Sequence, residues 1–131
     1  TVRYNTLYRP GRWALRILQE NRGDGIVRCR NGVFSHNIVC FQSGSLREAI
    51  NIGTDTEPQS FRFEANAWHC EDKPDVTRRL IRLPAEETKG TYGVEPRFRN
   101  PENGDFSLHP ESKVQNAGLR TETSRKVRKP E

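Results

Sequence analysis

Three short segments of the chain align on an asparagine, and this repeat limits what the chain can fold into more than any other feature. The segments are VRYNTLY at 2–8, FSHNIVC at 34–40 and FEANAWH at 63–69. In each, one apolar residue lies three positions before the asparagine and another lies two positions after it. The spacing is 32 residues from Asn5 to Asn37 and 29 residues from Asn37 to Asn66. A repeat of this length predicts similar units stacked along one axis.

The repeated segments and the stretches between them have the composition of β-strands. Two further apolar stretches, WALRILQ at 13–19 and AINIG at 49–53, lie between the asparagine segments. Short segments rich in Val, Ile and Phe and separated by Gly, Asn, Ser and Pro are typical of strands. Residues 13–19 would be apolar on nearly every side of a helix, whereas a strand places Trp13, Leu15 and Ile17 on one face. We therefore expect short strands throughout this part of the chain.

Asparagine at the repeated position predicts a sharp corner and a ladder of side chains. Asparagine tolerates the left-handed backbone conformation, and its amide can hydrogen-bond to backbone across a bend. In stacked units, Asn5, Asn37 and Asn66 can bond one another and so satisfy polar groups that would otherwise be buried without a partner. These features favour a solenoid of parallel β-coils over the alternative, an ordinary β-sandwich.

The second half of the chain has a different composition. Apolar residues thin out after Cys70, and Pro and Gly recur. A solenoid needs a cap, because an uncovered last coil leaves strand edges and apolar side chains open to other chains. The sequence therefore predicts β-helix coils in 1–72, an irregular C-terminal capping segment in 73–119 and a basic flexible tail in 120–131.

The chain is basic, with a formal net charge of +5, and much of the excess lies in the tail. The tail cations are Arg120, Arg125, Lys126, Arg128 and Lys129, against Glu122 and Glu131. A basic end can attract nucleic acid. No aromatic residue interleaves these cations to stack a base, so a solvated terminus is favoured over nucleic-acid binding. The sequence has no apolar run long enough to span a membrane, and we expect no signal peptide in it.

The cysteines and histidines do not form a metal-binding pattern. Cys29, Cys40 and Cys70 lack any C-x-x-C spacing, which argues against a zinc ribbon. One disulfide with a free thiol and three buried thiols both stay open as interpretations. The stretch WHCED at 68–72 cannot converge on one ion, because consecutive strand residues point to opposite faces. We expect no metal site.

The end of the chain resembles a known family. The stretch EPRFRNPENGDFSLHPESKVQNAG at 95–118 is similar to the pattern D-P-x-F-x-[DN]-P-x-x-G-D-[FY]-x-L-x-P-x-S-P-A-x-[DN]-x-G, which often closes right-handed parallel β-helix repeat proteins. This group includes polysaccharide lyases and the wider pectin-lyase-like superfamily. Two departures are that Glu95 replaces Asp and that Lys113-Val114 replaces Pro-Ala. The resemblance implies an all-β fold, a right-handed parallel β-helix of two to three coils whose closing segment covers the last coil.

The resemblance also implies where chemistry would lie. In such lyases a groove along one sheet is lined by Lys, Arg and acidic residues, sometimes with Ca²⁺. A Lys or Arg acts as the base in a lyase, and two facing carboxylates act in a hydrolase. The candidate catalytic residues are Arg16, Glu20 and Arg47. The candidate carbohydrate-binding residues are Trp13, Arg12, Glu48 and Trp68, because stacked strands lie close together and an indole ring offers a platform for a sugar.

These patterns lead to one functional expectation and two alternatives. We expect the C-terminal segment of a glycan-active or carbohydrate-binding protein, secreted or periplasmic by resemblance, which is itself structural or binding and not catalytic. The first alternative is a lyase-like enzyme acting on acidic polysaccharide. The second is a small basic protein that binds nucleic acid or self-associates through its open first coil. No cofactor is expected, and Ca²⁺ follows from the resemblance alone.

Overall fold

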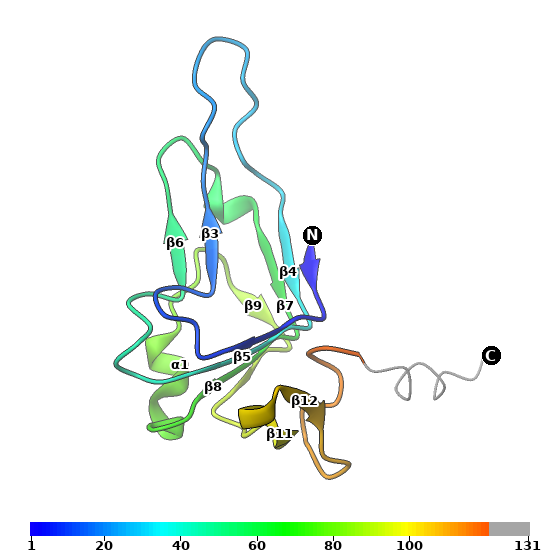
Figure 1. Ribbon diagram of the computed structural model, residues 1–131. Helices are drawn as coiled ribbons and strands as arrows, with labels where there is room; N and C mark the ends of the chain where they lie inside the picture. The colour runs from blue at the N-terminus through cyan, green and yellow to red at the C-terminus, as the bar shows by residue number, and fades with distance from the viewer. Residues whose placement is uncertain (121–131) are drawn as a thin grey trace, which may run out of the picture.

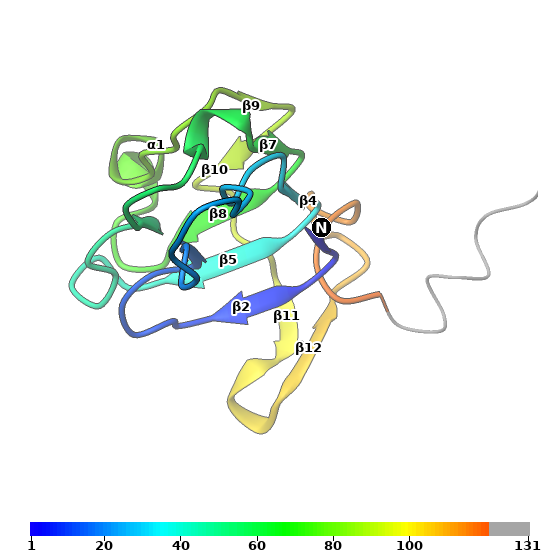
Figure 2. The same ribbon diagram turned by 90° about the horizontal axis from the view of Figure 1, so that it is seen from above.

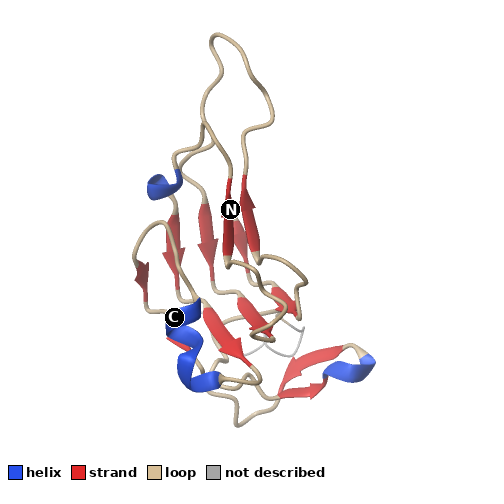
Figure 3. Ribbon diagram, turned by 90° about the vertical axis from the view of Figure 1, so that its left-hand side faces the viewer, coloured by secondary structure: helices blue, strands red, loops and turns tan. Residues whose placement is uncertain are grey.

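The computed structural model describes residues 1–120, which are mostly β and contain parallel sheets (Figure 1, Figure 3). Sheet I has the order β1 (Val2–Arg3), β4 (Val33–Ser35), β7 (Arg62–Glu64) and β9 (Glu87–Thr88). Sheet II has the order β10 (Thr91–Tyr92), β8 (Ala67–Cys70), β5 (Ile38–Phe41) and β2 (Thr6–Tyr8). Sheet III pairs β3 (Leu15–Ile17) with β6 (Ile50–Ile52). All pairings within these three sheets are parallel.

The chain visits the sheets in the same order on each passage, and we call one passage a rung. Rung 1 comprises 2–17, rung 2 comprises 33–52, rung 3 comprises 62–70 and rung 4 comprises 87–92. Parallel neighbours need a long crossover connection, and here the rest of each rung provides it. The register keeps equivalent residues in line, so that Leu7 pairs with Val39 and Val39 pairs with Trp68. The asparagine segments therefore occupy equivalent places in successive rungs.

The core lies between the sheets. It is built from side chains that stack in columns from one rung to the next. The Phe34 ring centroid lies 6.2 Å from that of Phe63 and 5.9 Å from that of Trp68. The buried cluster consists of Ile17, Phe34, Val39, Phe41, Ala49, Ile50, Phe63, Trp68, Cys70 and Ile81. Fully burying an aliphatic or phenylalanine side chain stabilises the fold by roughly 1.5–3 kcal/mol. Alternate residues along each short strand thus hold the rungs together.

Sheet III stops after rung 2. In rung 3 its place in the chain is taken by η2 (Pro74–Val76) and α1 (Thr77–Leu80), which bring Ile81 into the core. Pro74 lacks the N–H that a strand ladder requires. The Thr77 hydroxyl instead donates to the Pro74 carbonyl at 2.8 Å and accepts from the Cys70 N–H at 3.1 Å. The predicted strand over 13–19 is also shorter than expected, since β3 is limited to Leu15–Ile17.

A fourth rung lies within the region expected to be only a cap. Strands β9 and β10 add one row each to sheets I and II, pairing with β7 and β8. Sheets I and II therefore have four strands each, where two to three coils were expected. Thr91 pairs with Ala67, which follows Asn66 in the sequence. Gly90 therefore occupies in rung 4 the position that asparagine has in the earlier rungs. The asparagine alignment consequently missed it.

The closing segment does not cover the last rung. After rung 4 the chain forms an antiparallel hairpin of β11 (Phe98–Asn100) and β12 (Asp105–Leu108), joined by η3 (Pro101–Asn103). This hairpin lies beside sheet II (Figure 2), where the Phe106 ring is 5.3 Å from that of Tyr8 in rung 1. Val114 and Ala117 then pack on the outward side chains Ile38 and Ala67. The expected cap is therefore a side cover that runs across the rungs.

Gly118 allows the close approach of this segment to sheet II. Its φ is 80°, and its N–H donates to the His36 carbonyl at 2.8 Å. A Cβ at this position would lie 2.5 Å from Ile38 Cδ1, closer than packed atoms tolerate. Glycine at the end of the motif thus allows contact with the middle rungs.

Two remaining regions are peripheral. Residues 18–32 leave β3 in a long loop that extends away from the sheets before β4 (Figure 1). The predicted basic tail lies outside the described residues except for Arg120. Within residues 1–120, no helix has the length and apolar character needed to cross a membrane.

Candidate functional site

The corner between sheets I and II is built from the same pair of positions in every rung. The first residue of each pair has a left-handed backbone, with φ of 57° at Tyr4, 54° at His36, 53° at Ala65 and 56° at Lys89. An asparagine follows it in rungs 1 to 3, and Gly90 follows it in rung 4. The left-handed residue is thus the one before the asparagine, which corrects the expectation from sequence. We call Tyr4, His36, Ala65 and Lys89 the outer column.

The side chains of the asparagines form a hydrogen-bonded column, which we call the inner ladder together with Glu87. Asn5 Nδ2 donates to Asn37 Oδ1 at 3.1 Å, and Asn37 Nδ2 donates to Asn66 Oδ1 at 3.1 Å. The backbone N–H groups of Asn5 and Asn37 donate to the same two oxygens, both at 2.9 Å. Asn37 and Asn66 are completely buried. The ladder therefore satisfies polar groups that water cannot reach.

A carboxylate completes the ladder where rung 4 lacks asparagine. Glu87 Oε1 accepts from the Asn66 backbone N–H at 3.1 Å and from Asn66 Nδ2 at 2.7 Å. Its Oε2 accepts from Trp68 Nε1 at 2.9 Å and from the Tyr92 hydroxyl. A Cβ at Gly90 would lie 2.7 Å from this carboxylate, so glycine leaves the space that Glu87 fills. Burial and the adjacent Glu87 carboxylate raise the pKa of Tyr92.

Sequence reasoning missed Glu87, although a signal was present. Glu87 pairs with Phe63, at the position where earlier rungs have an apolar side chain. An acidic residue at an apolar position, three residues before a glycine at the ladder position, indicates a carboxylate replacing the missing amide.

Four of the predicted site residues lie together beside sheet III. The guanidinium carbon of Arg16 lies 4.6 Å from the Trp13 ring centroid, and that of Arg12 lies 5.9 Å from it. Arg16 Nε donates to Asn51 Oδ1 at 3.2 Å, and Asn51 Nδ2 donates to Glu48 Oε1 at 2.8 Å. The parallel pairing of Arg16 with Asn51 causes this contact. We call these five residues the arginine–tryptophan surface; Asn51 was not predicted.

The other predicted site residues lie elsewhere. Trp68 is fully buried in the core and its indole N–H is bound to Glu87, so it offers no platform to a sugar. Glu20 is exposed beyond β3 and makes no hydrogen bond or ion pair with another residue of 1–120, including Arg16. Arg47 is exposed, and within residues 1–120 only its backbone N–H is engaged, by the Arg12 carbonyl at 2.9 Å.

An ion pair joins rungs 1 and 3 at the far end of sheet II. Arg9 Nε and Nη2 donate to the two oxygens of Glu71 at 2.9 Å and 3.2 Å. Gln42 Nε2 also donates to Glu71, at 2.9 Å. The Arg9 guanidinium lowers the pKa of Glu71. This bidentate geometry is typical of a structural contact.

Buried titratable side chains of sheet II lie beside that ion pair. His69 is 7% exposed, and its Nδ1 has no hydrogen-bond partner within the described residues. Burial lowers the pKa of His69, although Glu95 and Glu71 oppose this effect. Burial raises the pKa of the Cys40 thiol to about 12, so the thiolate that a nucleophile requires is scarce.

The cysteines and acidic residues form no metal centre in this part of the molecule. Cys29, Cys40 and Cys70 are all free thiols, Cys40 and Cys70 being buried. Among residues 1–120, no three His, Cys, Asp or Glu side chains gather where they could hold a metal ion.

Comparison with known proteins adds no relative. No family model matches the chain, and neither a curated protein nor a solved structure gives a significant match. The function of the chain is therefore inferred from the geometry of its own residues.

Proposed function

We propose that the chain is a segment of a secreted or periplasmic right-handed parallel β-helix protein of the pectin-lyase-like kind, and that it binds acidic polysaccharide without cleaving it. The stacked parallel rungs and the closing motif at 95–118 support the first part of the proposal. One observation carries the second part: the guanidinium groups of Arg12 and Arg16 both lie over the Trp13 ring.

The chemistry of this surface suits a uronate-containing chain. A guanidinium can donate two parallel hydrogen bonds to a carboxylate. The Trp13 ring is half-buried, and its contact with Arg12 and Arg16 holds both guanidinium groups in place for such bonds. Asn51 and Glu48 add an amide and a carboxylate that can bond sugar hydroxyls. Binding therefore requires no rearrangement of sheet III.

Binding fits this surface better than catalysis. Arg12, Arg16, Arg47 and Glu48 are all exposed. Acid–base and electrostatic catalysis gain most of their strength in sites that exclude water. Arg16 is also engaged by Trp13 and Asn51, which leaves it a poor base. The lyase-like enzyme is the second candidate, and detection of unsaturated uronate products would favour it.

Calorimetric titration of the whole chain with polygalacturonate tests the proposal. We expect Trp13→Ala and Arg16→Gln each to weaken binding about tenfold, which corresponds to about 1.4 kcal/mol. Arg79→Gln is the matched control, because Arg79 is also exposed but lies on α1. Wild-type protein that does not bind, or control and test variants that weaken binding equally, would overturn the proposal.

Two further measurements address the remaining alternatives. Nucleic-acid binding through 120–131 concerns residues outside the described part of the chain, apart from Arg120. It predicts affinity for a single-stranded oligonucleotide that falls steeply with salt, because phosphate contacts release counterions. Self-association through rung 1, whose Val2 is 40% exposed, predicts a molar mass that rises with concentration in sedimentation experiments.

A further inference from the structure

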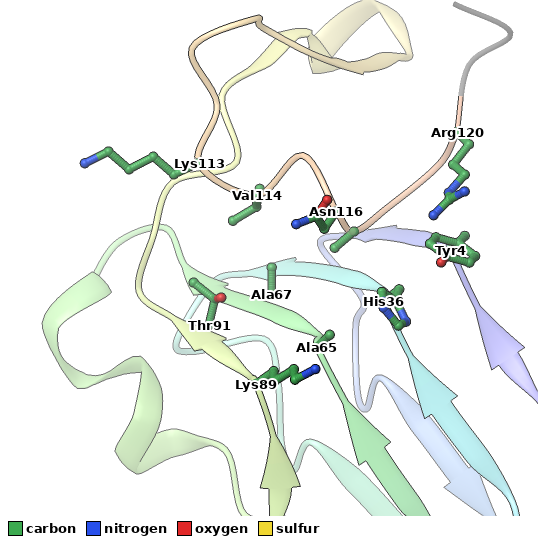
Figure 4. Close-up of a pocket in the computed structure, with 11 residues that line it drawn as sticks. Tyr4, His36, Ala65, Ala67, Lys89, Thr91, Lys113, Val114, Asn116 and Arg120 are labelled. Atoms are coloured by element: carbon green, nitrogen blue, oxygen red, sulfur yellow. The ribbon is translucent and has the colours of Figure 1, made fainter. Parts of the chain in front are cut away.

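A groove of about 320 Å³ separates the outer column from the closing segment (Figure 4). Its wall on the sheet side carries Tyr4, His36, Ala65, Ala67, Lys89 and Thr91. Its other wall carries Lys113, Val114, Asn116, Ala117 and Arg120. The groove thus exists because the closing segment crosses the rungs next to their corners. It shares no residue with the arginine–tryptophan surface.

The charge of this groove is of one sign. Among the described residues, Lys89, Lys113 and Arg120 line it and no Asp or Glu does; the Lys113 side chain points away from the other lining residues (Figure 4). None of these three cations forms an ion pair with a carboxylate among residues 1–120. Lys89 and Ala65 line the groove from adjacent rungs (Figure 4). Uncompensated cations in a concave site attract an anion.

The aromatic side chains at one end of the groove are already in contact. The ring centroids of Tyr4 and His36 are 5.0 Å apart and tilted by 31°. The Arg120 guanidinium carbon lies 3.6 Å from the Tyr4 ring centroid. Single-stranded nucleic acid is held mainly by bases stacking on free aromatic faces. The engaged Tyr4 ring therefore favours a smaller anion without a flat base.

We propose that this groove binds a carboxylate-bearing sugar. Its carboxylate would face the Lys89 ammonium, and its hydroxyls would bond the Thr91 hydroxyl and the Asn116 amide. The volume is at the lower end of the range of about 300–1,000 Å³ that small-ligand pockets occupy, which fits a short oligosaccharide and not an extended chain. The site is separate from the proposed polysaccharide surface and does not depend on it.

An NMR titration of the ¹⁵N-labelled chain with trigalacturonate tests this site. We expect saturable shift changes at the amides of Lys89, Thr91 and Asn116, and a dissociation constant from these signals that rises about tenfold in Lys89→Ala. Alanine is compatible with the left-handed backbone there, because Ala65 has the same conformation at the equivalent corner. Lys73→Ala is the matched control, because Lys73 is an exposed lysine outside the groove.

The outcomes separate the two proposed sites and the kinds of ligand. Shift changes confined to Trp13 and Arg16 would overturn the groove and leave the proposed function standing. Sodium sulfate shifting the same amides at equal concentration would reduce the site to a simple oxyanion site and overturn the sugar. Tighter binding of single-stranded DNA at these amides would overturn it in favour of nucleic acid. Equal effects of Lys89→Ala and Lys73→Ala would also overturn it.

Discussion

Two columns of side chains run along the same corner, one residue apart in the sequence, and they differ in the residue types that they carry. The inner ladder repeats one amide in three rungs and closes on the Glu87 carboxylate. The outer column carries tyrosine, histidine, alanine and lysine on an almost constant left-handed backbone. Only the outer column is left-handed, and the two columns also differ in the environment of their side chains.

This difference shows where the fold constrains the residue type. Inside the corner, backbone N–H groups are buried, and an unpaired one would cost about 1–3 kcal/mol. A side chain that donates and accepts at short range is therefore required there. Outside the corner, the left-handed residues of the outer column place their side chains next to a groove, where packing restricts the residue type less. Function is more easily placed on the outer column.

Asn37→Leu should have the largest effect. It removes Asn37 Oδ1, which leaves the part-buried backbone N–H of Asn5 without its partner, and it removes the Nδ2 donor to Asn66 Oδ1 and to the Val2 carbonyl. We expect a loss of about 3 kcal/mol or more in the free energy of unfolding, measured by urea denaturation. His36→Ala, one residue away, should lose less than about 1 kcal/mol. Equal losses in the two variants would break the distinction between the columns.

Gly90→Ala should have the next largest effect. The added Cβ would lie 2.7 Å from the Glu87 carboxylate and 2.9 Å from the Tyr92 ring, so that Glu87 must leave the end of the ladder. We expect a loss of about 1–3 kcal/mol, the range for an unsatisfied buried group, in thermal or urea unfolding. A neutral result would mean that Glu87 does not close the ladder.

Acid should destabilise the protein through His69, a buried residue of sheet II that belongs to neither column. Burial lowers its pKa in the folded state, so the unfolded state binds the proton more readily. The contribution of neutral His69 to the free energy of unfolding is complete above the pKa of about 6.5 that histidine has in the unfolded chain. As the pH drops below that pKa, the free energy of unfolding falls by at most about 1.4 kcal/mol per pH unit. Urea denaturation between about pH 5 and 7 measures this slope.

The acid slope can be assigned with matched variants. His69→Gln should remove most of it, and His36→Gln should retain it. The lowered pKa of Glu71 acts only below the carboxylate's ordinary value of 4.5, which separates the two effects. A slope that is unchanged in His69→Gln would contradict the assignment to the buried imidazole.

Lys89→Ala should have the smallest effect on stability. Its side chain is exposed, and alanine already occupies the equivalent corner at Ala65 with the same sign of φ. We expect the free energy of unfolding to change by no more than about 0.5 kcal/mol in urea denaturation. A large loss would show that the outer column also supports the corner.

The repeating strands of this fold could be predicted from the sequence, because the same residue types recur at the strand and corner positions of rungs 1 to 3. The asparagine segments place β1, β2, β4, β5, β7 and β8 in register. Rung 4 could not be found in this way, because it has no asparagine. Gly90 occupies the asparagine position there, and the Glu87 carboxylate accepts the hydrogen bonds that an asparagine side chain would accept. The candidate surface was predicted in part: Arg12, Trp13, Arg16 and Glu48 lie together, whereas Trp68 points into the core.

The sequence by itself determined the period of the chain and the chemistry of the inner ladder, because both depend on residues that recur at fixed spacing. Tertiary structure alone decided the path of the closing segment. Its apolar residues can cover any apolar face, and the outward side chains Ile38 and Ala67 of sheet II provided one. The groove beside the outer column follows from that path, since its two walls come from parts of the chain that local pattern does not relate.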